Sequence, residues 1–162
     1  MVKHLLEQGV LPHQEQGGVE DYHVEFCKTL IDAVKHGNTD IVRLLLEHGA
    51  DPNRLHAPDS PLMVAVRKGW FSVAETLFAA GAGANDDSPP PIVLAVLKEN
   101  MDMFRLLRRH GARLDTADSG GLAMTVAVHH GLQSMVDVLE HEGVERDMIL
   151  QSGGVDDRGD LD

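Results

Sequence analysis

The chain has 162 residues, of which 43% are hydrophobic and only 4% aromatic, so its core must be built mainly from aliphatic side chains. Its formal charge is −12, which argues against general binding to nucleic acids or anionic membranes, because their phosphates would be repelled. The lone cysteine, Cys27, excludes an intrachain disulfide, and no stretch approaches the about 18 apolar residues of a transmembrane helix. We therefore expect a soluble protein of the cytoplasm or nucleus.

The first predicted element is a short helix over residues 2–10, which ends near Gly9 and resembles the second half of the repeats that follow it. About eight residues are inserted after it, around 12–20. We therefore expect residues 1–22 to form an N-terminal half-repeat and an inserted loop. Two origins stay open, a natural N-terminal cap and a chain cut from a longer array.

From residue 23 onward, a glycine recurs after a run of leucine-like residues. The spacing is nearly fixed, at 32, 30 and 32 residues, and the glycines are Gly49, Gly81, Gly111 and Gly143. Self-similarity at this period predicts a solenoid of stacked repeats. Such a fold offers a long surface rather than a deep pocket, so binding is expected ahead of catalysis.

Each period contains two apolar segments joined by a polar turn. Spacing such as Ile41, Leu44 and Leu45 places apolar residues on one helix face, so the pattern predicts helix, turn, helix and loop. The expected first helices are 29–37, 61–69, 91–99 and 123–131, and the second helices are 40–49, 72–81, 102–111 and 134–143. Residues that can cap free N–H groups open the second helices, namely Asp40, Ser72, Asp102 and Ser134, and the recurring glycines are expected to end them.

The segments DAVKHGNTDIVRLLLEHGADPN (32–53) and SPLMVAVRKGWFSVAETLFAAGAGAN (60–85) resemble the ankyrin repeat. Two further copies are degenerate, with Glu99 where glycine is usual. The resemblance covers about residues 23–147 and implies an all-α ankyrin-repeat solenoid of stacked helix-turn-helix units with connecting loops or hairpins. The four repeats are predicted at about 23–54, 55–86, 87–115 and 116–147, and a disordered acidic tail is predicted at 148–162.

The resemblance also implies a concave binding surface, formed by loop tips and by the exposed ends of the first helices. Those ends carry cations, histidines and Leu97 but no carboxylate, and we call the charged set the basic stripe: Lys35, His36, Arg67, Lys68, Lys98, His129 and His130. The corresponding loop tips are Glu25, His56, Asp59, Asp86, Asp87, Asp118 and Ser119. Trp70 lies in the turn of the second repeat and is a candidate interface anchor.

A stripe without carboxylates predicts a groove for an acidic or phosphorylated segment of a protein partner. The plainer interpretation is that basic residues favour the C-terminal end of a helix. We predict a protein–protein interaction module, an adaptor or scaffold that is a monomer or associates weakly with itself. We expect no nucleic-acid or membrane partner and no cofactor.

Catalysis and metal binding have little support in the sequence. Phosphate-binding glycine loops, the GxSxG elbow and the HExxH pattern are absent, and Cys27 with His23 or His56 is the only conceivable nucleophile and base. We therefore predict neither an enzyme nor a metal site. Two alternatives remain, a self-assembling structural array and a divergent enzyme or small-molecule binder that uses a histidine-lined groove.

Overall fold

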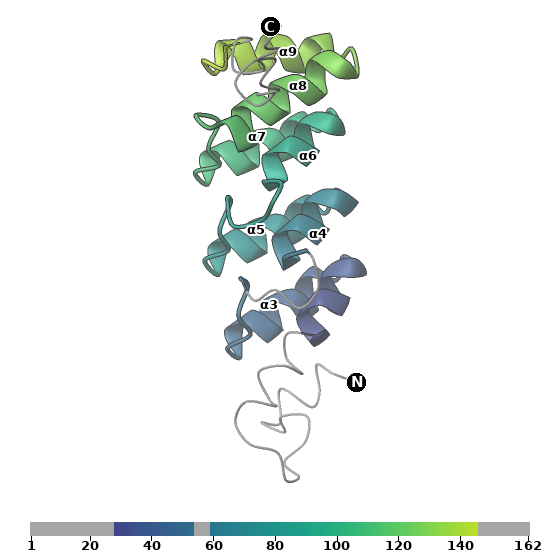
Figure 1. Cartoon of the computed structure of the whole chain (residues 1–162). Helices are drawn as coiled ribbons and strands as arrows, with labels where there is room; N and C mark the ends of the chain where they lie inside the picture. The colour runs from purple at the N-terminus through teal and green to yellow at the C-terminus, as the bar shows by residue number, and fades with distance from the viewer. Residues whose placement is uncertain (1–27, 54–58, 146–162) are drawn as a thin grey trace, which may run out of the picture.

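The computed structural model describes residues 28–53 and 59–145, and all of the regular secondary structure within them is helical. A helical segment over 28–35 is followed by the helices shown in Figure 1: α3 (Thr39–Glu47), α4 (Pro61–Lys68), α5 (Phe71–Ala79), α6 (Pro91–Leu97), α7 (Met101–Arg109), the π-helix η1 (Ala117–Gly121), α8 (Leu122–His129) and α9 (Gln133–His141). The all-α solenoid expected from the sequence is confirmed. The predicted half-repeat at 1–22 and the tail at 148–162 lie outside the described residues.

The helices stack in two columns (Figure 1). The first helices α4, α6 and α8 pack on one another, and the second helices α3, α5 and α7 form the other column. The core between them is almost wholly aliphatic, as expected, with Leu62, Leu77 and Ile92 no more than 1% exposed. An alanine at the same position of each first helix is buried, and its small side chain lets neighbouring helices approach closely: Ala33, Ala65, Ala95 and Ala127.

The C-terminal ends of the second helices follow the prediction, because the recurring glycines all have left-handed backbone angles, with φ between 84° and 90°. The N-terminal ends do not. Asn38 and Asn100 are the capping residues, and they accept hydrogen bonds from the amides of Ile41 and Met103 at 3.3 and 3.0 Å. The residues predicted as caps, Asp40, Ser72, Asp102 and Ser134, instead occupy the second position inside their helices.

Glu99 adopts a left-handed conformation with φ 50°, at the position where the other repeats have Gly37, Gly69 and Gly131. A side chain in this conformation costs about 1–2 kcal/mol, which the greater freedom of glycine in the unfolded chain offsets only in part. We therefore expect Glu99→Gly to raise the free energy of unfolding by about 0.5–1 kcal/mol. Urea denaturation would measure the change. The reverse control is Gly131→Ala, where φ is 67° and no atom lies within 4 Å of the added carbon, and it should lower the stability.

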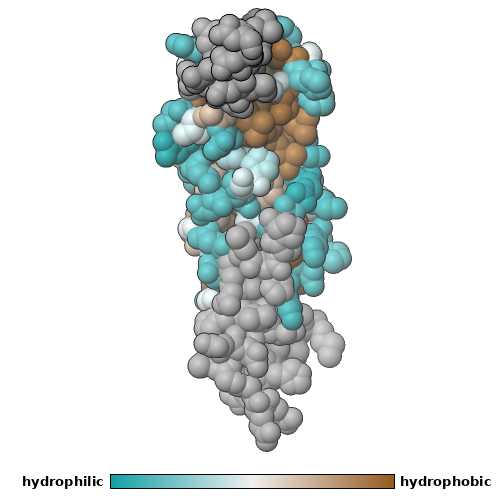
Figure 2. Space-filling model, in the orientation of Figure 1, coloured by the Kyte–Doolittle hydropathy of each residue, from teal (hydrophilic) through white to brown (hydrophobic). Residues whose placement is uncertain are grey.

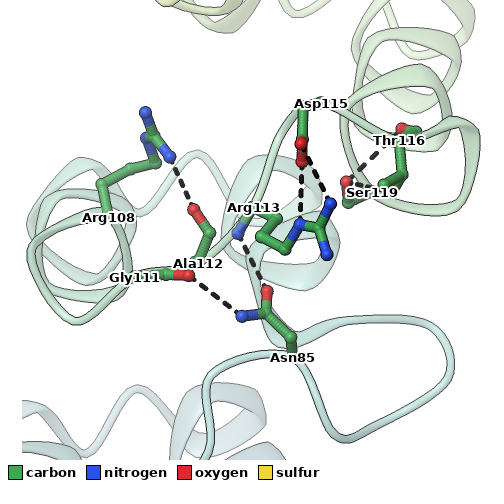
Figure 3. A network of polar contacts seen from close by, with 8 residues as sticks. All are labelled: Asn85, Arg108, Gly111, Ala112, Arg113, Asp115, Thr116 and Ser119. Carbon is green, nitrogen blue, oxygen red and sulfur yellow. Dashed lines mark hydrogen bonds and ion pairs between the residues drawn. The ribbon is translucent and has the colours of Figure 1, made fainter.

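Two asparagines join the loops of successive repeats. The amide group of Asn53 donates to the carbonyl of Gly81 at 3.0 Å and accepts from the amide of Gly83 at 2.8 Å. One repeat later, Asn85 donates to the carbonyl of Gly111 at 2.9 Å and accepts from the amide of Arg113 at 2.8 Å (Figure 3). These bonds fix the position of each loop relative to the loop of the next repeat.

Asp115 stands one period after Asn85 but turns to its own loop instead. It accepts hydrogen bonds from the guanidinium of Arg113 at 3.0 Å (Figure 3), and these bonds lower the pKa of the Asp115 carboxyl below its usual value. The next repeat therefore receives no asparagine-like contact from this position within the described part of the chain.

A buried polar contact fixes the start of α4. The carboxyl group of Asp87 accepts from the amide of Ser60 at 3.0 Å and from its hydroxyl at 2.6 Å, and that hydroxyl in turn accepts from the amide of Met63 at 3.0 Å. Ser60 and Asp87 are only 5% and 8% exposed. The loop after α5 thus caps α4 through Ser60 and ties two repeats together.

Candidate partner-binding surface

The structure places the whole basic stripe on the surface. Each of its residues is exposed and lies at the end of a first helix or directly after it, as predicted: Lys35, His36, Arg67, Lys68, Lys98, His129 and His130. Because α4, α6 and α8 pack side by side, their ends follow one another at about the 8–10 Å spacing of packed helices. The stripe residues of α4, α6 and α8 therefore follow one another in space.

The expectation that no carboxylate accompanies the stripe is wrong for its N-terminal half. Lys35 pairs with Asp32 at 3.1 Å, one turn earlier on the same helix. Arg67 makes a two-pronged contact with Asp59, with one of its hydrogen bonds at 2.8 Å, and this hydrogen bonding raises the pKa of Arg67. Asp59 directly precedes the N-cap of α4, and the long side chain of Arg67 extends back along the helix toward its N-terminus to meet it. The loop tip predicted at Asp59 is therefore already engaged.

Lys68 and Lys98 differ from those two cations. Both are exposed, and neither forms an ion pair with any residue in 28–53 or 59–145. Their ammonium groups occupy equivalent positions in neighbouring repeats. Among the described residues, they are the two lysine or arginine side chains of the stripe without an ion-pair partner.

The histidines of the stripe do not converge on one point. His36 places Nδ1 2.7 Å from the carbonyl oxygen of Asp32, which fixes its ring on its own helix. His129 and His130 contact each other edge to face, with ring centroids 5.2 Å apart. Among the described residues, no group of three or more histidine, cysteine, aspartate or glutamate side chains is arranged to hold a metal ion.

Trp70 lies against the preceding repeat. Its indole covers Gly37 so closely that a Cβ added to that glycine would lie 2.8 Å from the ring. Trp70 is nevertheless 40% exposed. The ring therefore packs on the preceding repeat while part of it remains accessible to solvent, and its role as an anchor stays a prediction.

Two other predicted loop tips are not at the surface. Asp87 is bonded to Ser60, and Ser119 is 2% exposed and within 2.6 Å of the hydroxyl of Thr116, as Figure 3 shows. Both side chains are drawn inward because each satisfies polar groups at the start of a helical segment. Asp86 and Asp118 are exposed as expected. Glu25, His56, Cys27 and His23 lie outside the described residues.

An apolar area on α6 and α8 is not predicted by the repeat pattern, in which Leu97 is the exception among the charged helix ends. Leu97, Leu122 and Val128 are 42%, 37% and 47% exposed. Figure 2 shows a brown, hydrophobic area over this part of the stack. The available signal was Leu97 itself, which stands where the other first helices have Lys35, Arg67 and His129. The stripe therefore runs beside apolar surface in its C-terminal half.

Comparisons with known proteins agree with this architecture. The family model for ankyrin repeats, in three copies, matches residues 1–88. The helix pairs continue beyond that match through α9. Within the described ranges, the helices are too short or too polar to cross a membrane.

Several curated proteins are similar to the chain. The mouse cyclin-dependent kinase 4 inhibitor B is 36% identical over 96 residues, which are 57% of this chain and 74% of that protein. The human protein of the same name is 33% identical over 115 residues, or 68% and 83% of the two chains. A putative ankyrin repeat protein of fowlpox virus is 31% identical over 123 residues, which cover 73% of this chain and 28% of the viral one.

Proposed function

Because the chain belongs to the ankyrin-repeat family and is a protein–protein interaction module, we propose that it recognises an acidic or phosphorylated segment of its partner along the basic stripe. The observation that carries the proposal is the pair Lys68 and Lys98. Both ammonium groups are exposed and lack an anionic partner among the described residues, in a protein whose net charge is −12. Binding rather than catalysis is the proposed activity.

The surroundings of the two lysines support a mixed polar and apolar contact. Leu97 precedes Lys98 and is 42% exposed, so a bound segment would meet an apolar side chain beside the Lys98 charge. Carboxylate or phosphate groups would form charge-assisted hydrogen bonds with the lysines. Arg67 is held by Asp59 and would contribute less, because that ion pair would have to be exchanged.

The relatives suggest which partner to try first. Two of them are named as inhibitors of cyclin-dependent kinase 4, and the mouse protein is aligned over 74% of its length. We propose a protein kinase of the cyclin-dependent class as the first candidate. Its binding to this chain would be tested directly with purified kinase.

Reversing the two free charges should weaken partner binding by about a hundredfold, because each new carboxylate would face an anionic group of the partner. The variant is Lys68→Glu with Lys98→Glu, and affinity would be measured by calorimetry against cyclin-dependent kinase 4 and against partners captured from cell extract. The matched control is Arg105→Glu with Arg109→Glu, which changes the net charge equally at exposed sites on the second helix α7. Equal loss in both variants, or no loss in the first, would contradict the stripe as the binding surface.

A further inference from the structure

The second helices interlock through one recurring contact. In α5 and α7, the eighth residue of the helix contacts the residue directly after the next second helix. Phe78 of α5 stacks flat on His110 at the end of α7, with ring centroids 4.2 Å apart and planes 3° from parallel. Arg108 of α7 donates two hydrogen bonds to Glu142 at the end of α9, at 3.0 and 2.8 Å.

Between α3 and α5 the corresponding residues are Leu46 and Ala80, and the space is not filled. An open groove of about 720 Å³ lies there, lined by Leu46, Ala79 and Ala80 together with Arg43, Glu47 and Glu75. Ala80 has only a methyl group where His110 and Glu142 have long side chains. The groove therefore exists because one partner of the recurring pair is missing, while the helices on both sides stay packed.

We infer that this groove binds an aromatic side chain of a partner protein, in a segment that also carries lysine or arginine. The ring is inferred because the equivalent space in the next repeat is occupied by a stacked aromatic pair, so the repeat geometry accommodates one planar ring against Leu46 and Ala80.

The basic residue is inferred from charge. Glu47 and Glu75 are exposed at the groove and form no ion pair within the described part of the chain, and they outnumber Arg43. The net charge of −12 adds a long-range attraction for a cationic segment. An acidic segment would be repelled at this site.

This site is independent of the basic stripe. The stripe follows the ends of the first helices, whereas the groove lies between two second helices, in the other column of Figure 1. The two surfaces select segments of opposite charge. The chain is therefore built to hold two different segments at once, as a scaffold does.

The test uses the whole chain and the peptide acetyl-Lys-Trp-Lys-amide, followed by NMR chemical shifts of the backbone amides. We expect shifts at Leu46, Ala79 and Ala80. The charge-matched peptide acetyl-Lys-Ala-Lys-amide should bind about tenfold more weakly, because it lacks the ring, and acetyl-Glu-Trp-Glu-amide should be weakened similarly. Equal binding of all three peptides, or no shift at the groove, would overturn the inference.

Two variants locate the binding. Leu46→Phe with Ala80→His rebuilds the stacked pair of the next repeat and should abolish the shifts. Glu47→Lys with Glu75→Lys leaves the groove open and should lower the affinity for the Lys-Trp-Lys peptide by about tenfold. This variant tests the inference even if the first variant does not fold. Lys68→Glu with Lys98→Glu should leave this binding unchanged. Unchanged shifts in both groove variants would overturn the inference without affecting the proposed function of the stripe.

Discussion

Asp87→Ala is expected to lower the free energy of unfolding by about 3 kcal/mol, because a buried hydrogen-bond acceptor is removed while its donors remain. The amide and the hydroxyl of Ser60 both lose their partner, and Ser60 is only 5% exposed, so water cannot replace the carboxyl group without opening the structure. The loss would be measured by urea denaturation followed by circular dichroism.

Two controls separate this contact from a general packing effect. Asp87→Asn keeps one acceptor oxygen for the Ser60 amide and should lose about 1 kcal/mol. In the Ser60→Ala variant the donor hydroxyl is already absent. Adding Asp87→Ala should therefore lower the free energy of unfolding by less than it does in the wild type. A loss below about 1 kcal/mol for Asp87→Ala alone would show that the buried contact contributes little.

Gly120→Ala is the second change expected to have a large effect, about 3 kcal/mol of lost stability. A Cβ at this position would lie 1.9 Å from the carbonyl oxygen of Leu114, and a backbone atom cannot rotate away. The π-helical segment Ala117–Gly121 would have to separate from the loop before it, and α8 follows directly. Thermal unfolding and the amide shifts of α8 would report both the lost stability and the displacement.

Gly83→Ala provides the comparison for this prediction. Its Cβ would lie 1.8 Å from a carboxyl oxygen of Asp86, which is an equally short contact, but Asp86 is an exposed side chain that can change rotamer. We therefore expect the Gly83 variant to lose less than about 1 kcal/mol. Similar losses at both glycines would mean that close approach to the backbone is not what makes Gly120 necessary.

The positions of the helices could be predicted from the sequence because each repeat buries the same apolar positions. The glycine period placed every second helix to within a residue or two, and the recurring alanines marked the buried side of the first helices. The caps were misplaced by two residues. Asp40 and Asp102 have suitable chemistry, but Asn38 and Asn100 stand where the backbone leaves the turn, and the helix begins immediately after them.

The contacts between repeats were harder to predict, because they depend on how far a side chain can reach in three dimensions. The sequence placed Arg67 in a stripe free of carboxylates, yet its long side chain reaches back along α4 to Asp59, just before the helix begins. The bonds of Asn53 and Asn85 join residues 26 to 30 positions apart. Their recurrence 32 residues apart was visible in the sequence, but nothing there indicated that both would bond the following loop.

Asp115 affects how the last repeats of the described stack are joined, and so how they unfold. Because an aspartate cannot donate to a carbonyl as Asn53 and Asn85 do, the coupling between the last two repeats lacks the pair of loop bonds found earlier in the stack. In a linear array each repeat contacts only its neighbours, so the stability of the array is about the sum of the repeat stabilities and the neighbour interfaces. Opening of the α8–α9 pair is then opposed by the packing of α8 on α6 and by the Arg108–Glu142 bonds, without loop bonds from position 115, so local unfolding there should depend on these contacts.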